Sequence, residues 1–403
     1  MVYKKLSLFF IFVFINLISC DIFAYDPEKK IEGIGNEKEI ADYILNNIIK
    51  LYDVPQHGLL SETYPINPNN KVDYLAEGST QNHNQEVSFL WPYSGTLSGA
   101  VALYTITKNQ KYLNLLEKRL IPGLEKYFDE SRFPVGYQSY PTFAGHNDRY
   151  YDDNVWLALD FCALYLSTKD QKYLDKALEI YDFIYSGWDE KLGGGIYWCE
   201  QKKTSKNTCS NAPTVVLSAK LYQLTNDEKF LSRSIETYNW TKTNLLDPTD
   251  FVYWDNVGLN GNVDKRKYTY NSGQMIEAGV LLYCITRDQN YLTDAQKTAS
   301  GTYEHFTKMK PISVGDAVFY SDSPWFNTIL FRGLKALYKV DGNKKYVQTM
   351  LENAHYAWSN TTDNNNLLGN TWSKKSTQRY KWLLDNACMI ELFAELADIE
   401  LKK

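Results

Sequence analysis

A short phrase of the form Thr-x-Asp/Asn-x-x-aromatic-Leu recurs along the chain. Its copies are residues 107–113, 168–174, 225–231 and 286–292, with a looser copy at 340–347. The period of about sixty residues is long enough to hold one supersecondary unit, and regular self-similarity is typical of architectures built from stacked units. The repeat therefore limits the chain to a periodic fold.

Each phrase separates two stretches with helical periodicity. An apolar stretch such as 155–166 precedes it, and an amphipathic stretch such as 173–185 follows it. Each unit is thus predicted to be a helical hairpin with a tight turn. Polar residues suitable as N-caps precede the helices that lead into the turns. The candidates are Ser94, Asp152 or Asp153, Asn211, Asn271, Asp322 or Ser323, and Asp385 or Asn386.

These six helix starts, an opening helix at about 37–51 and the helices after each turn give twelve predicted helices. The predicted fold is all-α, a closed ring of six hairpins known as an (α/α)6 toroid.

The connections at the two ends of the hairpins are unequal in length. One end has only the short turns, whereas the other carries segments of about 53–93, 122–151, 187–210, 245–270, 311–321 and 359–381. Loops that long in a compact domain are usually functional, so the site is predicted on their face. They carry many aromatic rings, among them Tyr93, Tyr151 and Trp198. Rings with a polar edge suit the mixed faces of a sugar, which favours a carbohydrate groove.

Two adjacent aspartates, Asp152 and Asp153, stand at one of these helix starts. Neighbouring Cα atoms lie about 3.8 Å apart. Side chains that diverge from there can end near the roughly 5 Å separation expected of the two carboxyl groups in a retaining glycosidase. Like charges so close cannot ionise independently, so one carboxyl should keep its proton to higher pH. Helix capping is the alternative interpretation, but it needs only one of the two.

Charge and motifs exclude several other functions. The net charge is −5 at pH 7 and no basic tract occurs, so nucleic acid is not an expected partner. The sequence motifs of zinc peptidases, serine hydrolases and phosphate-binding loops are absent, and neither a metal nor a cofactor is predicted.

The cysteines do not form the pattern of a zinc cluster or of a dense disulfide scaffold. Cys199 and Cys209 could form one local bridge in an oxidising compartment. Cys162, Cys284 and Cys388 lie within apolar helical patterns and are predicted to be buried thiols.

The N-terminus is predicted to be an export signal, because Lys4 and Lys5 precede an apolar run, 6–18, that is too short to span a bilayer. The run ends in Leu-Ile-Ser-Cys at 17–20, which resembles the bacterial lipobox. Residues 1–20 are therefore interpreted as a lipoprotein-type signal with lipidation at Cys20. Cleavage after Ala24 is the alternative.

Residues 21–35 would then be a linker and 36–403 one catalytic domain. The expected location is the outer membrane or cell surface, otherwise the periplasm or the medium. The protein is expected to be a monomer that meets the membrane only through its lipid anchor.

Five motifs occur in order along the chain. They are Tyr-Tyr-Asp-Asp-Asn-Val-Trp at 150–156, Gly-Trp-Asp at 187–189, Gly-Gly-Gly-Ile-Tyr-Trp at 193–198, Lys-Asn-Thr-Cys-Ser-Asn-Ala-Pro at 206–213 and Tyr-Asn-Ser-Gly-Gln at 270–274. Together they resemble glycoside hydrolase family 76, the endo-α-1,6-mannanases, in the lineage seen in Bacteroidota. The resemblance covers nearly all of the mature chain. It implies an (α/α)6 toroid, retention of anomeric configuration and cleavage within α-1,6-linked mannose backbones such as fungal cell-wall mannan.

The resemblance also implies roles for individual residues. Asp152 becomes the nucleophile and Asp153 the general acid/base. The residues expected to bind the α-mannan polysaccharide or manno-oligosaccharides are Tyr93, Tyr151, Gly194, Gly195, Trp198, Lys206, Asn207, Asn211, Asp255, Asn256, Asn271 and Gln274. Helix capping is the alternative for Asn211 and Asn271, and a plain tight turn is the alternative for the glycines.

Two other functions remain compatible with the sequence. One is another (α/α)6 carbohydrate-active enzyme, namely a uronyl hydrolase, an epimerase or a transglycosidase. The other is a surface lipoprotein that binds glycan without catalysis, although the intact aspartate pair argues against a decayed site.

Overall fold

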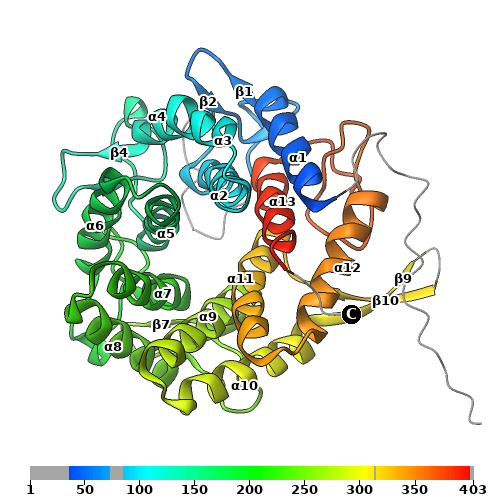
Figure 1. Ribbon diagram of the computed structural model, residues 1–403. Coiled ribbons are helices and arrows are strands. Elements are labelled where there is room, and N and C mark those ends of the chain that lie inside the picture. The colour runs from blue at the N-terminus through cyan, green and yellow to red at the C-terminus, as the bar shows by residue number, and fades with distance from the viewer. Residues whose placement is uncertain (1–35, 73–84, 313–314, 400–403) are drawn as a thin grey trace, which may run out of the picture.

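The computed structural model describes residues 36–72, 85–312 and 315–399, and within them two concentric rings of helices surround a common axis (Figure 1). The predicted signal peptide 1–20, the lipidation site Cys20 and the linker 21–35 lie outside the described residues.

The inner ring consists of α2 (Leu90–Thr107), α5 (Tyr151–Thr168), α7 (Thr208–Thr225), α9 (Thr269–Thr286), α11 (Pro324–Asp341) and α13 (Leu383–Leu396). The outer ring consists of α1 (Glu37–Leu51), α3 (Gln110–Leu115), α6 (Gln171–Tyr185), α8 (Glu228–Leu245), α10 (Gln289–Phe306) and α12 (Lys345–Asn360). A π-helical turn, Leu116–Leu120, joins α3 to the short α4 (Ile121–Leu124). Each inner helix packs on the next, and α13 packs on α2 and closes the ring. The predicted (α/α)6 toroid is confirmed.

The repeated phrase forms the turn from each inner helix to the outer helix that follows. Thr168 ends α5, and its hydroxyl donates to the Leu164 carbonyl (2.7 Å) and accepts from the Asp170 amide (3.1 Å). Lys169 takes the left-handed conformation, with φ of 61°. The Asp170 carboxylate then caps α6 by accepting from the Lys172 amide. The same bonds recur in the turns at 107–111, 225–229 and 286–290.

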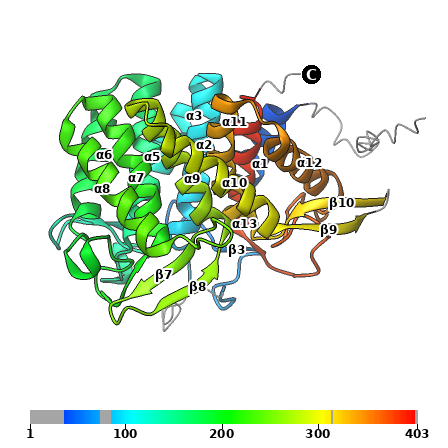
Figure 2. The same ribbon diagram turned by 90° about the horizontal axis from the view of Figure 1, so that it is seen from below.

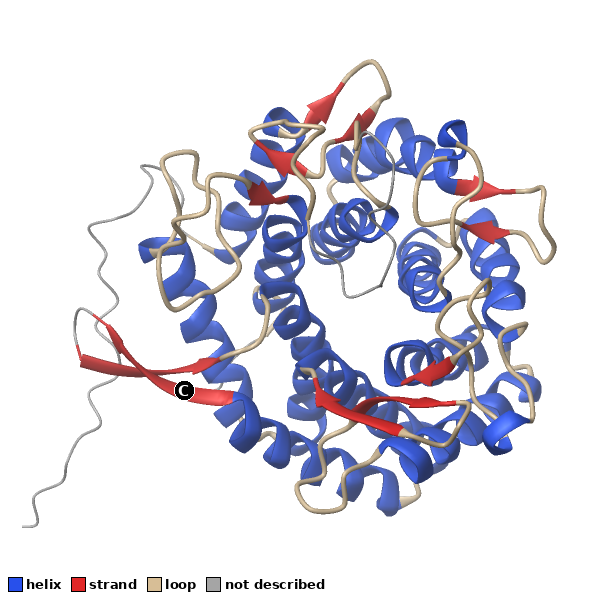
Figure 3. Ribbon diagram, turned by 180° about the vertical axis from the view of Figure 1, so that it is seen from behind, coloured by secondary structure: helices blue, strands red, loops and turns tan. Residues whose placement is uncertain are grey.

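The opposite ends of the hairpins carry the long loops, which contain short strands that the repeat did not predict (Figures 2 and 3). The strands are β1 (Asp53–Val54), β2 (Leu59–Leu60), β3 (Thr63–Tyr64), β4 (Phe128–Asp129), β5 (Gly136–Tyr137), β6 (Ser205–Asn207), β7 (Trp254–Gly258), β8 (Val263–Lys267), β9 (Thr307–Ile312), β10 (Gly315–Tyr320) and β11 (Lys381–Trp382). All pairings are antiparallel, and β3 pairs with β11, so the first and last long loops are joined. Seen from the side, β7 and β8 lie at the end opposite the short turns (Figure 2).

The inner helices begin about one turn earlier than the sequence predicted. Of the candidate N-caps, only Ser323 directly precedes its helix, and Asp322 stands one residue before it. The other candidates lie inside the first turns of their helices; they are Ser94, Asp152, Asp153, Asn211, Asn271, Asp385 and Asn386. The prediction of capping by these residues is wrong.

Backbone carbonyls of neighbouring loops cap several inner helices instead. The first amide of α2, that of Leu90, donates to the Ser139 carbonyl at 2.8 Å. The first amide of α5, that of Tyr151, donates to the Trp198 carbonyl at 2.9 Å. Any hydrogen-bond acceptor can satisfy a free N–H group at a helix start, so a polar side chain in the preceding position is unnecessary.

Candidate active site

Asp152 and Asp153 are the second and third residues of α5, at the end of that helix where a long loop enters it. Both side chains are half-buried. They lie at a helix N-terminus, where free N–H groups and the helix dipole favour negative charge. The backbone N–H groups of both residues lower the pKa of the Asp152 carboxyl.

Trp198, in the loop before α7, fixes the orientation of Asp152. Its indole Nε1 donates to Asp152 Oδ2 at 3.1 Å, and its ring packs on Tyr150 with centroids 5.1 Å apart. The Trp198 carbonyl accepts from the first amide of α5, so ring and backbone are both attached to this helix start. The buried Asp152 Oδ1 has no hydrogen-bond partner among the described residues. One oxygen is therefore held while the other stays available.

The two carboxyls have raised pKa values for different reasons. Burial raises the pKa of Asp152 to about 6, while the neighbouring Cys209 thiol and the Trp198 indole hold it down. Burial and the charge of Asp152 raise the pKa of Asp153 well above its usual range, and no donor to its charged form opposes them. Near neutral pH the pair therefore carries one proton, on Asp153.

The sixfold repeat brings equivalent residues together beside Asp152. Counted from the start of each inner helix, the second residues are Trp91, Asp152, Cys209, Tyr270, Trp325 and Leu384. Five of them stand sixteen residues before the residue that ends their helix at the turn. Cys209 lies near Asp152 and Tyr270, and the Tyr270 ring lies 5.8 Å from that of Trp325. The second positions of α5, α7, α9 and α11 thus lie side by side at the mouth of the inner ring.

Aromatic rings form one side of this arrangement. Tyr270 stacks on Phe326 at 4.2 Å, and Trp325 makes edge contacts with Trp91 at 5.0 Å and with Trp156 at 5.3 Å. Trp156 lies one turn below Asp152 on α5. Such a wall offers apolar faces to the C–H faces of a sugar ring.

A third acidic group lies on the loop side of the pair. Asp255 on β7 is buried, and burial raises its pKa. Asn256 donates to it at 3.0 Å, Arg266 lies 3.5 Å away, and Asn271 on α9 lies next to it. Both Asp255 and Asp152 act electrostatically on Cys209, so the two carboxylates belong to one region. Asp255, Asn256, Asn271 and Trp198 are the predicted binding residues that the structure brings to the pair.

Several other predicted binding residues serve the scaffold. Lys206 is fully buried, and its ammonium donates to the carbonyls of Asp189, Lys191 and Gly194 at 2.6 to 2.8 Å and to the Asp189 carboxylate. Asn211, also fully buried, donates to the Ile196 carbonyl and accepts from the Ile196 amide. The side chains of both residues thus hold the backbone of neighbouring loop segments in place.

The remaining predicted binding residues make packing contacts or hydrogen bonds within the protein. Added Cβ atoms on Gly194 and Gly195 would come within 2.5 Å of the Trp188 and Trp240 rings, and both glycines have positive φ. The other four are engaged as follows: the Tyr93 hydroxyl donates to the Leu120 carbonyl, Tyr151 stacks on Phe183, Asn207 accepts from the Ser205 hydroxyl, and Gln274 donates to Glu277. The sugar-binding roles expected of these residues stay predictions.

Cys199 and Cys209, for which a local bridge was considered, are both free thiols. Their partners differ: Cys199 lies 3.9 Å from the Gln201 side-chain oxygen, whereas Cys209 faces Asp152. Cys162 and Cys388 are buried as predicted, and Cys284 is half-buried.

Within 36–72, 85–312 and 315–399, no three or more His, Cys, Asp and Glu side chains form a group that could hold a metal ion. None of the helices in this part of the chain has the length and apolar character needed to cross a membrane.

Six helical hairpins in a closed ring, with paired carboxyls and an aromatic wall on the long-loop face, define an (α/α)6 carbohydrate-active enzyme. The chain belongs to glycosyl hydrolase family 76, whose sequence model matches residues 38–398. The resemblance noted from the five motifs is thereby confirmed.

Solved structures and curated sequences agree with this membership. A family 76 mannosidase from Bacteroides thetaiotaomicron is 29% identical, with a TM-score of 0.80 over 90% of this chain and 98% of that one. The α-1,6-mannanase GH76A of Salegentibacter, as an inactive variant with two consecutive aspartates replaced by asparagine and with α-1,6-mannotriose bound, is 24% identical. Its TM-score is 0.72 over 91% of this chain and 100% of that one.

Among curated relatives, mannan endo-1,6-alpha-mannosidase DFG5 of Saccharomyces cerevisiae is 22% identical over 79% of this chain and 73% of its own length. Of three other curated relatives, from Schizosaccharomyces pombe, the chain spans only 49% to 66% of their length.

Proposed function

We propose that the protein is a retaining, endo-acting glycoside hydrolase that cleaves α-1,6-mannosidic linkages in mannan backbones of the fungal cell-wall type. Asp152 is the nucleophile and Asp153 the general acid/base. The observation that carries the proposal is the unequal environment of two adjacent carboxyls. The Trp198 indole donates to Asp152 and favours its charged form, whereas burial and the charge of Asp152 keep the proton on Asp153. A double displacement needs one carboxylate and one carboxylic acid.

In the first step, an Asp152 oxygen attacks the anomeric carbon and the glycosidic C–O bond breaks. Asp153 gives its proton to the departing oxygen, so the leaving chain departs as an alcohol and a mannosyl ester forms on Asp152. In the second step, the Asp153 carboxylate takes a proton from water as that water attacks the same carbon. The ester bond breaks, Asp152 regains its charge, and Asp153 regains its proton. Because Trp198 occupies Oδ2, Oδ1 is the oxygen assigned to the attack.

The choice of linkage rests on the relatives. Their names specify mannan endo-1,6-alpha-mannosidase activity in yeast and α-1,6-mannanase activity in Salegentibacter. The aromatic wall of Tyr270, Trp325 and Phe326 supplies the apolar contacts that a chain of mannose rings requires.

The test compares Asp152→Asn and Asp153→Asn with the unmodified protein on linear α-1,6-mannan. Each substitution removes one of the two chemical roles, so we expect a loss of at least about a thousandfold in kcat. Asp175→Asn is the matched control, because Asp175 is an exposed acid on α6 that accepts only from Gln171. Near-full activity in either site variant would overturn the assignment.

Product analysis tests the endo action, the retention of anomeric configuration and the preference for hydrolysis over transfer. Endo cleavage releases oligosaccharides of several lengths early in the reaction, and proton NMR of the first product should show the α-anomer. A β-anomer would contradict the double displacement, and transfer products on added mannose would indicate a transglycosidase. No products with clear mannan binding would favour the glycan-binding alternative.

The proposal extends to location and assembly. The protein would be exported, lipidated at Cys20 and held as a monomer at the outer membrane or cell surface. Radioactive palmitate should label the unmodified protein and not Cys20→Ala. An N-terminus that begins at Tyr25 would favour cleavage after Ala24 instead.

A further inference from the structure

Arg149 lies three residues before Asp152, in the segment that leads into α5. Its side chain is fully buried, although arginine is mostly exposed in folded proteins. The guanidinium pairs with the Glu200 carboxylate through two hydrogen bonds, from Nε to Oε2 at 2.7 Å and from Nη2 to Oε1 at 2.5 Å. Nη1 donates to the carbonyls of Arg132 and Pro134 at 3.1 and 3.0 Å. A bidentate pair of this kind fixes the geometry of both side chains as well as balancing their charges.

Glu200 belongs to the same loop segment as Trp198, whose indole donates to Asp152 Oδ2 at 3.1 Å. Residues 149–151 and 198–200 lie antiparallel, with a bridge at the centre and amide-to-carbonyl hydrogen bonds of 3.0 and 2.9 Å at the ends. The Arg149–Glu200 pair joins the two segments at one end of this short pairing, and the Trp198–Asp152 bond joins them at the other, where α5 begins. The segment that carries the indole is therefore held to the start of α5 by side chains as well as by backbone.

We propose that Arg149 is a positioning residue, which acts through Glu200 to hold the Trp198 indole against the Asp152 carboxylate. The role rests on the proposed function of Asp152 as nucleophile. The Glu200 side chain is 20% exposed, so without the arginine its carboxylate can turn toward solvent and the loop segment loses a side-chain attachment to the start of α5. Because an N–H···O hydrogen bond needs about 2.7–3.2 Å between its heavy atoms, a shift of the indole by about 1 Å would break its bond to Asp152.

The effect of Arg149 on kcat should depend on the indole. If the arginine acts through Trp198, it matters to kcat only while the indole is present, so the two substitutions are not additive. An arginine that merely stabilises the fold would lower kcat by the same factor with or without the indole. A double-substitution cycle therefore separates the two roles.

The experiment measures kcat and KM on linear α-1,6-mannan for Arg149→Met, Trp198→Phe and the double variant. In Arg149→Met we expect kcat to fall about tenfold, the effect of losing one hydrogen bond to a charged group. KM should change little, since a fully buried guanidinium does not contact the substrate. In the double variant kcat should agree with that of Trp198→Phe to within about twofold. An unchanged kcat in Arg149→Met, or a further tenfold loss in the double variant, would overturn the inference.

Lys335→Met is the matched control for loss of a buried cation. Only 9% of the Lys335 side chain is exposed, and its ammonium pairs with Glu395 and, at 2.7 Å, with Asp398 on the short-turn side of the ring. The control should lose stability as Arg149→Met does but keep its kcat. An equal loss of kcat in the two variants would show that destabilisation alone explains the result, and the inference would fall.

If Arg149→Met does not fold, Arg149→Met/Glu200→Leu takes its place in the cycle, because it leaves no buried charge without a partner. The expected results are the same: a loss of kcat that disappears when Trp198→Phe is added. A kcat equal to that of the unmodified protein, or a loss that persists without the indole, would overturn the inference. Failure of the proposed function is distinguishable, since the unmodified protein would then be inactive on mannan or Asp152→Asn would be active.

Discussion

Asp152 and Asp153 are consecutive residues, yet their surroundings assign them opposite charge states. Asp152 accepts a hydrogen bond from Trp198, and the neighbouring thiol of Cys209 and the backbone N–H groups of its own helix start also lower its pKa. Asp153 is buried beside the charge of Asp152, and no comparable donor lowers its pKa. The difference is set by which way each side chain leaves the helix, not by residue type.

The pH dependence of hydrolysis follows from these two shifts. Activity needs Asp152 ionised, so it should rise through an apparent pKa near 6, the value to which burial raises this group. It needs Asp153 protonated, so it should fall again only on the alkaline side, because the pKa of that group is raised further. The measurement is kcat/KM against pH, and both limbs belong to the coupled pair. Full activity at pH 4 would contradict the prediction.

Trp198 gives a second test at this scale. Trp198→Phe keeps a ring against Tyr150 but removes the indole donor to Asp152 Oδ2, which lies 3.1 Å away. We expect kcat to fall by about tenfold to a hundredfold, which corresponds to about 1.5–3 kcal/mol for a hydrogen bond to a charged group. Trp240→Phe is the control, because that indole donates to the Leu192 carbonyl, remote from the pair. Equal losses of kcat in both variants would contradict a specific role.

The sequence identified the aspartate pair but not its neighbours Cys209 and Tyr270. Sequence alone weighed Cys209 as a disulfide partner, because its nearest cysteine lies ten residues away in the chain. The signal that finds both residues is the constant spacing of sixteen residues to the turn, which marks equivalent positions on every repeat. Lys206 is the opposite case, because the sequence predicted it as a binding residue. Only the folded loop shows that its ammonium donates to three backbone carbonyls.

At the scale of elements, three asparagines on inner helices join the helix starts to the preceding loops. Asn154, Asn211 and Asn386 are each the fourth residue of their helix. Each hydrogen-bonds both the amide and the carbonyl of one loop residue, namely Tyr137, Ile196 and Leu368. The side-chain amide thus makes the same two hydrogen bonds to that residue as a residue of a neighbouring antiparallel strand would make. The sequence interpreted Asn211 and Asn386 as possible caps because an asparagine near a helix start usually is one.

Asn386→Ala tests the energetic importance of these bonds. It leaves the buried amide and carbonyl of Leu368 without this partner, and we expect a loss of about 2–4 kcal/mol in the free energy of unfolding. Urea denaturation followed by circular dichroism provides the measurement. Asn46→Ala is the control, because Asn46 is exposed on α1 and donates only to the Asp42 carbonyl. A change of less than about 0.5 kcal/mol in both variants would contradict the prediction.

At the scale of the whole molecule, four of the six long loops each cap the inner helix that precedes them in the ring. The loop before α5 caps α2 through Ser139, and the loop before α7 caps α5 through Trp198. The loop before α11 caps α9 through the Asp322 carboxylate, and the first loop caps α13 through the Glu62 carbonyl. The sequence predicted the ring because helical periodicity is local, whereas these caps depend on loops brought together only after the ring closes.

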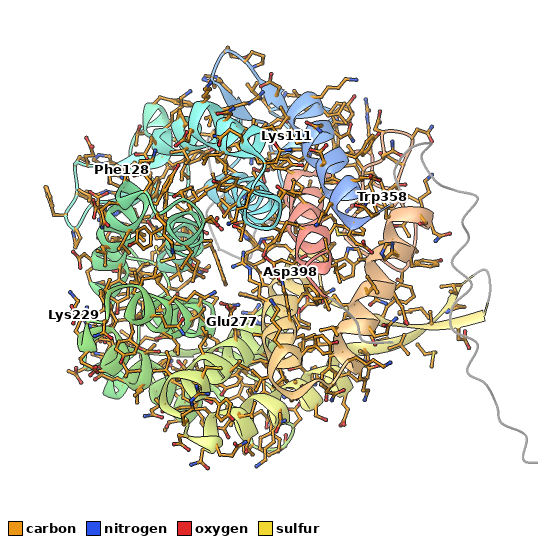
Figure 4. The ribbon with its side chains drawn as sticks, in the orientation of Figure 1. Lys111, Phe128, Lys229, Glu277, Trp358 and Asp398 are labelled. Atoms are coloured by element: carbon orange, nitrogen blue, oxygen red, sulfur yellow. The ribbon has the colours of Figure 1, made fainter. Side chains whose placement is uncertain are left out.

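The interior of the ring on the short-turn side is charged rather than apolar. A cavity of about 340 Å³ is lined by residues of all six inner helices, including Asp160, Glu277, Arg332, Lys335 and Glu391. Glu277 points inward, whereas Lys229 lies on the outer rim (Figure 4). Lys220 pairs with Glu277 at 2.8 Å, Arg332 pairs with Glu391 at 2.5 Å, and the Ser98 hydroxyl donates to Asp160 at 2.7 Å. These polar contacts link α7 to α9, α11 to α13 and α2 to α5.

Arg332→Met tests this central network. Only 17% of the Arg332 side chain and 4% of the Glu391 side chain are exposed, so the substitution leaves a buried carboxylate without its partner. We expect unfolding to become easier by about 3–5 kcal/mol. The double variant Arg332→Met/Glu391→Leu removes both charges and should recover a large part of that loss, because the desolvation of the carboxylate is then avoided. Lys172→Met is the control, since Lys172 pairs with Glu117 on the surface and should cost less than about 1 kcal/mol. A double variant as unstable as Arg332→Met would show that the arginine acts through its other contacts, among them the Trp156 ring beneath the aspartate pair.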